Sequence, residues 1–275
     1  MEPSMYEKKA LVEIERYLKP QTGIFSKIGN MISIPLEKVF ELVEKIPGYE
    51  TVIMKSVRGI LELLNDASLW SVNSSSIHAY IRRHGIPDFD SCIRFRHDLE
   101  LLDGHIGSLN LKYAVATAAE GGGAGLAGAV GIPVDAAAMF SMNMRAIGEY
   151  ATYYGYNIEQ PVERLFALNV LQFASSPGSV ANYQALLELD KLYHKIRLLT
   201  RWSTLDTSLI VVAIKKVAQL VGVRLTKAKL AQIVPVIASL IGAGFNGHFT
   251  NRACTAAYQL YRRRFLCDKY QLDLP

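Results

Sequence analysis

The sequence predicts an all-α protein, a multi-helix bundle with glycine-rich apolar helical hairpins. Three observations support this fold class. Apolar residues recur at spacings of three and four along most of the 275 residues, as they do on one face of an α-helix. Proline and glycine stand at the expected starts and ends of several of these segments. We find no run in which apolar and polar residues alternate, as they would in a half-buried strand.

The first expected helix covers residues 5–18, where Leu11, Ile14 and Leu18 share a face and Pro20 follows. The sequence HGIPDFD combines glycine, proline and two aspartates, and it suggests the end of an N-terminal helical subdomain. We therefore divide the chain into a subdomain of residues 1–86 and a second domain of residues 87–275. The other helices predicted for the first half lie at residues 34–46, 50–65, 77–84 and 89–119, the last being one long helix.

Prolines and glycines divide the second half of the chain. Pro133 is expected in the first turn of a helix that runs to Tyr154, with Gly155 just past its end, where a left-handed residue is favoured. Pro161 is expected to begin the next helix, which runs to Ala174. Further helices are predicted at residues 180–200, at 206–221 and, as two helices divided near residues 242–247, at 228–266.

The composition excludes several classes of protein. Lys and Arg outnumber Asp and Glu by 30 to 25, and this basic balance favours a phosphate-bearing partner without distinguishing lipid from nucleic acid. Cys92, Cys254 and Cys267 lack the spacing of a disulfide framework or a structural zinc site. Residues 1–20 carry charges from residue 2 onward and lack the apolar core of a secretory signal. We therefore expect a cytoplasmic protein that uses no cofactor.

The segment AAEGGGAGLAGAVGIPVD, residues 118–135, is unusually rich in glycine. Gly123, Gly125 and Gly128 spell G-x-G-x-x-G, the fingerprint of a dinucleotide site. That fingerprint must follow a β-strand, whereas here it follows an alanine-rich helical stretch, and no Walker lysine is present. The context therefore argues against a nucleotide site.

The same segment is too short to cross a membrane as one helix. Residues 121–134 are uncharged but would extend only about 21 Å, against a hydrocarbon core of roughly 30 Å. Gly121, Gly125 and Gly128 have the spacing that lets two helix backbones approach closely, which favours packing in the core of the bundle. A location at a membrane interface remains open for this segment and for the second apolar segment, residues 233–245.

The helix expected after Pro133 carries a polar stripe. Asp135, Met142, Arg145 and Glu149 fall at offsets of 0, 7, 10 and 14 and therefore share a face. Arg145 and Glu149 are one helical turn apart, a spacing common on ordinary solvated helices. The stripe is either a solvated edge or a buried network that fixes the packing.

A metal-dependent hydrolase is the alternative hypothesis for function. His97 and Asp98 form an HD pair, and Glu100, Asp103 and His105 follow closely. On one helix Asp98 points about 100° away from His97, and three ligands do not converge without another segment. The remaining histidines are dispersed, so we assign no catalytic residue and keep His97, Asp98 and His105 as the metal alternative.

The basic residues occur in clusters, which are Arg82–Arg83, Lys215–Lys216, Arg224 with Lys227 and Lys229, and Arg262–Arg264. None of these clusters is interleaved with aromatic residues as a base-stacking surface would be, so no nucleic-acid partner is expected. Lysines and arginines beside a short apolar segment suit anionic headgroups. The candidate lipid contacts are Lys215, Lys216, Arg224, Lys227 and Lys229.

Two blocks of the sequence resemble the EcsC family. The first is EGGGAGLAGAVGIPVDAAAMFSMNMRAIGEYATYYGYNIEQPVERLFAL, with its glycine-rich turn, Pro and Asp, an arginine-bearing helix, a Tyr-Gly break and Pro-x-Glu-Arg. The second is LTKAKLAQIVPVIASLIGAGFN, and together they extend the resemblance over about residues 90–266. The matching positions, which mark the family's fold rather than catalysis, are Glu120, Gly121, Gly125, Gly128, Pro133, Asp135, Arg145, Gly155, Pro161, Glu163 and Arg164 in the first block and Lys215, Lys216, Pro235, Gly242, Gly244 and Asn246 in the second.

The resemblance implies a function without specifying an activity. The family takes its name from a bacterial operon that also encodes an ABC transporter, and it has no settled enzymatic activity. We therefore expect a non-enzymatic accessory protein at the inner face of a membrane. Its expected partners are an anionic membrane surface and a membrane protein, while its oligomeric state is open.

Overall fold

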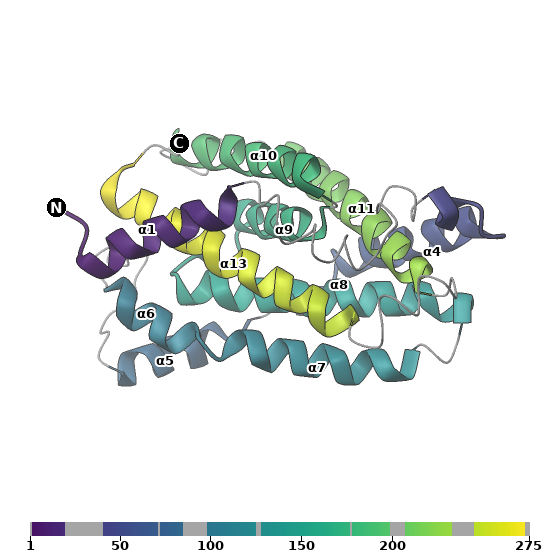
Figure 1. Ribbon diagram of the computed structural model, residues 1–275, viewed down its shortest axis with the longest axis horizontal. Coiled ribbons are helices and arrows are strands. Elements are labelled where there is room, and N and C mark those ends of the chain that lie inside the picture. The colour runs from purple at the N-terminus through teal and green to yellow at the C-terminus, as the bar shows by residue number, and fades with distance from the viewer. Residues whose placement is uncertain are drawn as a thin grey trace.

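The computed structural model describes residues 2–19, 41–70, 72–84, 98–124, 128–176, 178–198, 207–232 and 245–272. In these ranges every regular element is helical, which confirms the all-α prediction. The helices, labelled as in Figure 1, are α1 (Met5–Leu18), α4 (Tyr49–Leu63), the 3-10 helix η1 (Ala67–Trp70), α5 (Ser74–Arg83), α6 (Leu99–Ile106), α7 (Leu109–Ala124), α8 (Gly128–Tyr153), α9 (Pro161–Ser175), α10 (Gly178–Leu198), α11 (Thr207–Ala231) and α13 (Phe245–Tyr270).

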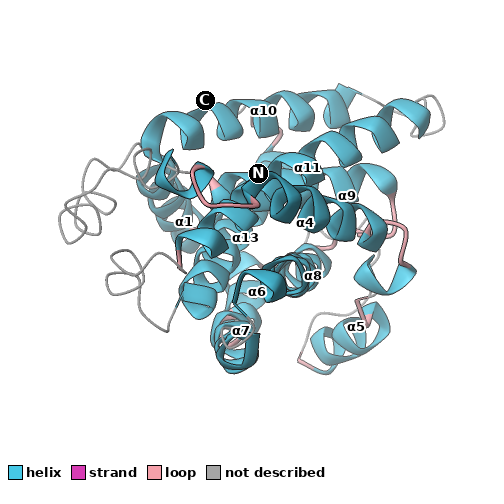
Figure 2. Cartoon of the chain, turned by 90° about the vertical axis from the view of Figure 1, so that its right-hand side faces the viewer, coloured by secondary structure: helices cyan, strands magenta, loops and turns pink. Residues whose placement is uncertain are grey.

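The last helix, α13, lies at the centre of the arrangement. It packs against α7, α8 and α9, while α1 lies across its outer side (Figure 1). In Figure 2, α10 and α11 lie on the upper side of the molecule and α5 and α7 on the lower side. The two termini lie at one end of the bundle, and the end of α7, the start of α8 and the end of α11 lie at the other (Figure 1). Within the described ranges, no helix combines the length and apolar composition that a membrane span needs.

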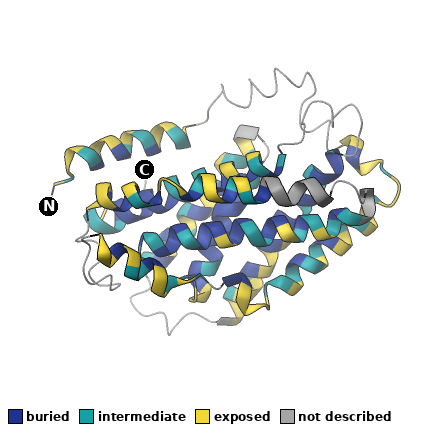
Figure 3. Cartoon of the chain, turned by 90° about the horizontal axis from the view of Figure 1, so that it is seen from below, coloured by how far each residue is buried: buried dark blue, intermediate teal, exposed yellow. Residues whose placement is uncertain are grey.

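One hydrophobic core joins helices from both halves of the sequence. It contains Ala10 and Ile14 of α1, Ile60 of α4 and Phe265 of α13, together with the C-terminal half of α8 and most of α9. Helix α9 is buried almost all round, because α8, α10, α11 and α13 surround it, as the dark ribbons of Figure 3 show for the centre of the bundle. The predicted subdomain boundary at residues 86 and 87 lies outside the described residues, as do residues 34–40 of the helix expected at 34–46.

Several predicted elements agree with the structure. Helix α1 has the predicted bounds, and it begins with a capping box in which Ser4 and Glu7 each bond to the other's backbone N–H. The helices expected at 50–65 and 77–84 correspond to α4 and α5, and Pro161 begins α9 at its first position. Helix α8 ends where Gly155, with a φ of +81°, reverses the chain.

Three predicted bounds are wrong. The helix expected at residues 89–119 is interrupted at Gly107, which separates α6 from α7, because α6 packs on α1 and α8 whereas α7 packs on α13. Helix α8 begins at Gly128, so Pro133 lies inside it, where a proline close to the helix start removes one backbone hydrogen bond. Helix α11 continues past residue 221 to Ala231. Gly222 lies inside this helix because a residue without a side chain lets α11 approach α4 closely. A Cβ there would lie 3.1 Å from Ile60.

Candidate functional site

The three consecutive arginines of α13, one of the basic clusters of the sequence, are all buried. Because successive residues of a helix point about 100° apart, Arg262, Arg263 and Arg264 face three different neighbours. Each meets a carboxylate there, on α6 and α1, on α10 and on α9 respectively. This cluster is therefore not a solvated surface, and α13 is the cationic centre of a buried network.

Arg264 forms the most deeply buried of these ion pairs. Its two terminal nitrogens donate to the carboxylate of Glu163 over 2.6 and 2.7 Å, and its guanidinium lies over the rings of Tyr156 and Phe166. Burial alone would lower the pKa of Arg264, but the charge and hydrogen bonds of Glu163, together with Tyr156 and Asp268, outweigh burial and hold this pKa above its ordinary value. Glu163 follows Pro161 in the Pro-x-Glu-Arg motif, so the motif places a carboxylate in the core at the first turn of α9.

Arg262 lies between the main bundle and α1. Its Nε is 2.7 Å from Asp103 of α6, and one of its terminal nitrogens donates over 2.8 Å to Glu13 of α1. Asp103 also accepts from the hydroxyls of Tyr6 and Tyr154 over 2.8 and 2.7 Å. Burial of Asp103 opposes its ionisation, whereas Arg262 and the two hydroxyls stabilise the carboxylate. Burial has the larger effect, so the pKa of Asp103 lies above its ordinary value.

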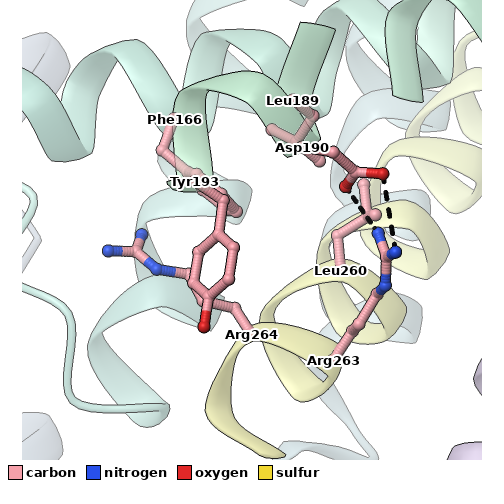
Figure 4. Close-up of a pocket in the computed structure, with 7 residues that line it drawn as sticks. All are labelled: Phe166, Leu189, Asp190, Tyr193, Leu260, Arg263 and Arg264. Atoms are coloured by element: carbon pink, nitrogen blue, oxygen red, sulfur yellow. Dashed lines mark hydrogen bonds and ion pairs between the residues drawn. The ribbon is translucent and has the colours of Figure 1, made fainter. Parts of the chain in front are cut away.

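Arg263 closes one side of a small pocket. It binds Asp190 of α10 over 2.7 Å, and the pocket is otherwise lined by Phe166, Leu189, Tyr193, Leu260 and Arg264. Figure 4 shows the two arginines pointing to opposite sides of this pocket. Because both guanidinium groups already bind carboxylates, the pocket offers a small ligand no unpaired charge among the described residues.

A further ion pair with a buried cation lies at the other end of the bundle. Lys229 of α11 is 3 % exposed, and its amino group is 2.6 Å from Asp135 of α8 and also donates to Asn246 of α13. Burial lowers the pKa of Lys229, while the hydrogen bond and charge of Asp135 oppose that change. Asp135 and Asn246 follow the two glycine-rich segments, so this cluster holds the ends of both segments together.

The other candidate lipid contacts have different environments. Lys215 and Lys216 are exposed on α11. Arg224 donates to the carbonyl of Gln172 and to the hydroxyl of Ser176, both at the end of α9, and Lys227 is 2.5 Å from Glu44. The burial of Lys229 removes it from the set of side chains available to a membrane surface.

The remaining predicted positions are mainly structural where they are described. Arg145 is exposed, and Glu149 binds Lys112 of α7 over 2.9 Å. Arg164 lies over the ring of Trp70. Helix α7 contains Glu120 and Gly121, and α8 starts at Gly128. The positions outside the described residues are Gly125, Pro235, Gly242 and Gly244.

The metal hypothesis finds no support in the described residues. Asp98 caps the N-terminus of α6 by accepting from the N–H of Glu100 over 2.9 Å. His105 packs against the rings of Tyr80 and His84. In the described ranges, no three His, Cys, Asp or Glu side chains come together as metal ligands, and His97 lies outside them.

Sequence reasoning did not foresee the polar contacts around α13, which involve Tyr154, Asp190 and, on α13 itself, Asp268. Asp268 accepts from the hydroxyls of Tyr156 and Tyr193 over 2.9 and 2.8 Å. One signal was present in the sequence. Tyr261 and Phe265 lie on one face of the helix, and at 100° per residue Arg262 and Arg264 each fall only about 60° from one of these two rings, close to the apolar face.

The comparisons with known proteins give one match. Residues 8–266 match the EcsC protein family, a range that extends the resemblance seen in the two sequence blocks to α1. No curated protein and no solved structure matches the chain.

Proposed function

This chain belongs to the EcsC family, and from that premise we propose that it is an accessory protein that binds peripherally to an anionic membrane surface beside a membrane-protein partner. The observation that carries this proposal is the outer face of the first half of α11. On that face, exposed apolar side chains lie next to two exposed lysines.

The apolar part of this face is formed by Leu209 and Val212, which are 67 % and 63 % exposed. They lie three residues apart and therefore on one side of the helix, and Lys216 continues the same stripe one turn further on. Lys215 lies beside it, also exposed. Within the part of the chain that the structure describes, neither lysine has a carboxylate within 4.0 Å.

This arrangement suits the boundary between headgroups and acyl chains. Exposed leucine and valine side chains gain free energy when they leave water, and a helix lying in the interface plane buries them in the outer acyl region. Each lysine close to an anionic surface contributes about 1 kcal/mol, an attraction that salt screens. The outer face of α11 therefore offers both components of peripheral binding.

The other basic clusters of α11 and α13 support the same choice of face. Arg224, Lys227 and Lys229, on the second half of α11, bind groups of the bundle, and the arginines of α13 are buried. Lys215 and Lys216 are thus the predicted lipid contacts that face solvent.

Vesicle co-sedimentation tests this proposal. We expect the protein to sediment with vesicles containing phosphatidylserine at low salt, and to stay in solution with neutral vesicles or at high salt. The Lys215→Glu, Lys216→Glu variant should lose this binding. Arg82→Glu, Arg83→Glu is the matched control, since it makes the same charge change on an adjacent exposed pair of α5, on the opposite side of the molecule (Figure 2).

The variants also separate the components of binding. Leu209→Ser, Val212→Ser should weaken binding while leaving its salt dependence, because it removes only apolar contacts. Equal loss in both charge variants would show attraction to net charge alone and contradict a lipid-binding face on α11. Binding to native membranes that is abolished by trypsin treatment of those membranes, without binding to pure lipid, would assign recognition to the membrane-protein partner.

A further inference from the structure

Helix α1 is an outlying element of the bundle. It packs on α13 and α6, and Figure 3 shows it apart from the other helices. The side chains it buries, Glu7, Ala10 and Ile14, recur at spacings of three and four and form one stripe toward α13. Ala10 and Ile14 join the hydrophobic core, while Glu7 makes polar contacts within the same stripe. Four further side chains of α1 pack partly buried against the core, namely Tyr6, Leu11, Tyr17 and Leu18.

Two carboxylates of α1 meet basic side chains of α13. Glu7 accepts from the amino group of Lys269 over 2.7 Å and from the hydroxyl of Tyr270 over 2.6 Å. Glu13, six residues further along, accepts from Arg262 over 2.8 Å. At this contact, two carboxylates of α1 therefore lie on a basic and aromatic stripe of α13.

The basic stripe keeps partners of its own when α1 is absent. Arg262 retains Asp103 at 2.7 Å, and Asp103 retains the hydroxyl of Tyr154. The ring of Tyr258, on α13 itself, stays beneath the guanidinium. Loss of α1 therefore leaves Arg262 with a buried counter-charge, so the surface beneath α1 stays formed when the helix leaves.

We propose that this α13 groove, formed by Tyr258, Arg262, Lys269 and Tyr270, is a docking site for an acidic amphipathic helix of a partner protein, and that α1 occupies it as a displaceable intramolecular surrogate. Charge complementarity defines the partner. Its helix carries two carboxylates six residues apart, with a small residue midway and a branched apolar residue after the second, as α1 does in E-x-x-A-x-x-E-I. This inference is independent of membrane binding, because it concerns a different helix and a protein ligand instead of a lipid surface.

Because α1 and a partner helix compete for the same groove, the attachment of α1 would regulate binding of the partner. A tethered helix has an effective concentration in the millimolar range, so a free helix of the same pattern competes poorly against it. Weakening α1 without touching the groove should therefore open the groove to a ligand added in solution. Glu7→Gln, Glu13→Gln does this, because it removes both charges while keeping the shape of each side chain.

The test uses the full chain and a fluorescent peptide of residues 2–19 as the probe. We expect the peptide to bind the Glu7→Gln, Glu13→Gln protein at least about tenfold more tightly than it binds the unaltered protein. A peptide carrying the same two glutamines should not bind either protein. Glu15→Gln is the matched control, because Glu15 pairs only with Lys19 of the same helix in the described structure, and this protein should behave like the unaltered one.

Two results would overturn the proposal. Equal affinity for the altered and unaltered proteins would show that α1 does not compete for the groove. A dimer of the unaltered protein at the same concentrations would assign the groove to α1 of a second copy instead of a different partner.

If the double variant fails to fold, hydrogen exchange of the unaltered protein tests the proposal instead. Exchange of α1 at least about a hundredfold faster than that of α13 supports a displaceable helix. Exchange of both helices at one rate, in a single global opening, contradicts it.

Discussion

Glu163 and Arg264 face each other between α9 and α13 through two hydrogen bonds of 2.6 and 2.7 Å, with side chains that are 5 % and 4 % exposed. The two residues are 101 positions apart in the chain, so the pair fixes the register of two central helices. Removing one partner leaves the other as a buried charge, which is far more costly than removing both.

We therefore predict that Glu163→Gln lowers the free energy of unfolding by about 3 kcal/mol. Glu163→Leu combined with Arg264→Met should recover most of that loss, because no buried charge is left. Urea unfolding followed by circular dichroism measures both. The reference is Arg58→Ala, which breaks an exposed pair with Glu62 and should cost at most about 1 kcal/mol. Similar losses in Glu163→Gln and Arg58→Ala would contradict the role of burial.

The Lys229 cluster predicts a local effect at the ends of the glycine-rich segments. Lys229→Met removes the cation that joins Asp135 to Asn246 and should cost about 3 kcal/mol. Hydrogen exchange should quicken first at the start of α13 and in α8 around Asp135, before α9 is affected. Lys227→Met is the control, since its partner Glu44 is largely exposed. Uniform acceleration throughout the bundle would argue against a local clamp.

Gly155 allows α8 to end where it does. The N–H of Gly155 donates to Thr152 and that of Tyr156 to Ala151, the bonding pattern of a Schellman motif with its left-handed residue at Gly155. Gly155→Ala should cost about 1–2 kcal/mol, because an L side chain is strained at that φ. Gly104→Ala, inside α6 with open space around it, should be neutral or stabilising by up to about 1 kcal/mol. Thermal unfolding of the two variants compares these effects. Equal shifts of the melting temperature in both variants would contradict the requirement for glycine at residue 155.

The attachment of α1 should depend on pH. Burial opposes ionisation of Glu7, but its hydrogen bonds from Lys269 and Tyr270 outweigh burial and hold the pKa below its ordinary value of 4.5. A carboxylate with a lowered folded-state pKa stabilises the fold above its unfolded pKa, and this contribution is lost as the pH falls through the lower value.

The contact between α1 and α13 should therefore loosen as the pH falls below about 4.5. A dye attached to Met5→Cys, in a Cys92→Ser background, reports this as a drop in fluorescence anisotropy, because Cys254 and Cys267 are buried. With Glu7→Gln added, the anisotropy should already be lower at neutral pH and should change less on acidification. A drop of the same size with and without Glu7→Gln would exclude Glu7 as the titrating group.

The sequence predicted the helices whose ends carry their own signals. Ser4 and Glu7 mark the start of α1, Pro161 that of α9, and Gly155 the end of α8, and each acts through local backbone chemistry. The wrong bounds occur where tertiary packing decides the outcome. Gly222 suggests a helix end by composition, yet it lies within α11 because α4 packs against it.

The candidate site was predictable only in part. The family motif singled out Asp135, Glu163 and Asn246, but nothing in their local sequence names the partner of each, since Lys229 and Arg264 come from distant helices. The burial of the α13 arginines was not predictable, because composition does not distinguish a solvated cation from a buried one. Only the fold brings the matching carboxylates to them.

The central position of α13 has a consequence for synthesis on the ribosome. Asp103, Glu163 and Asp190 all leave the ribosome before the arginines that neutralise them, because α13 follows their helices in the chain. Until α13 emerges, a compact core would have to enclose carboxylates without counter-charges. Burial of these carboxylates in the nascent chain is therefore unfavourable. Polypeptides truncated before α13 should consequently remain open and accessible to proteases.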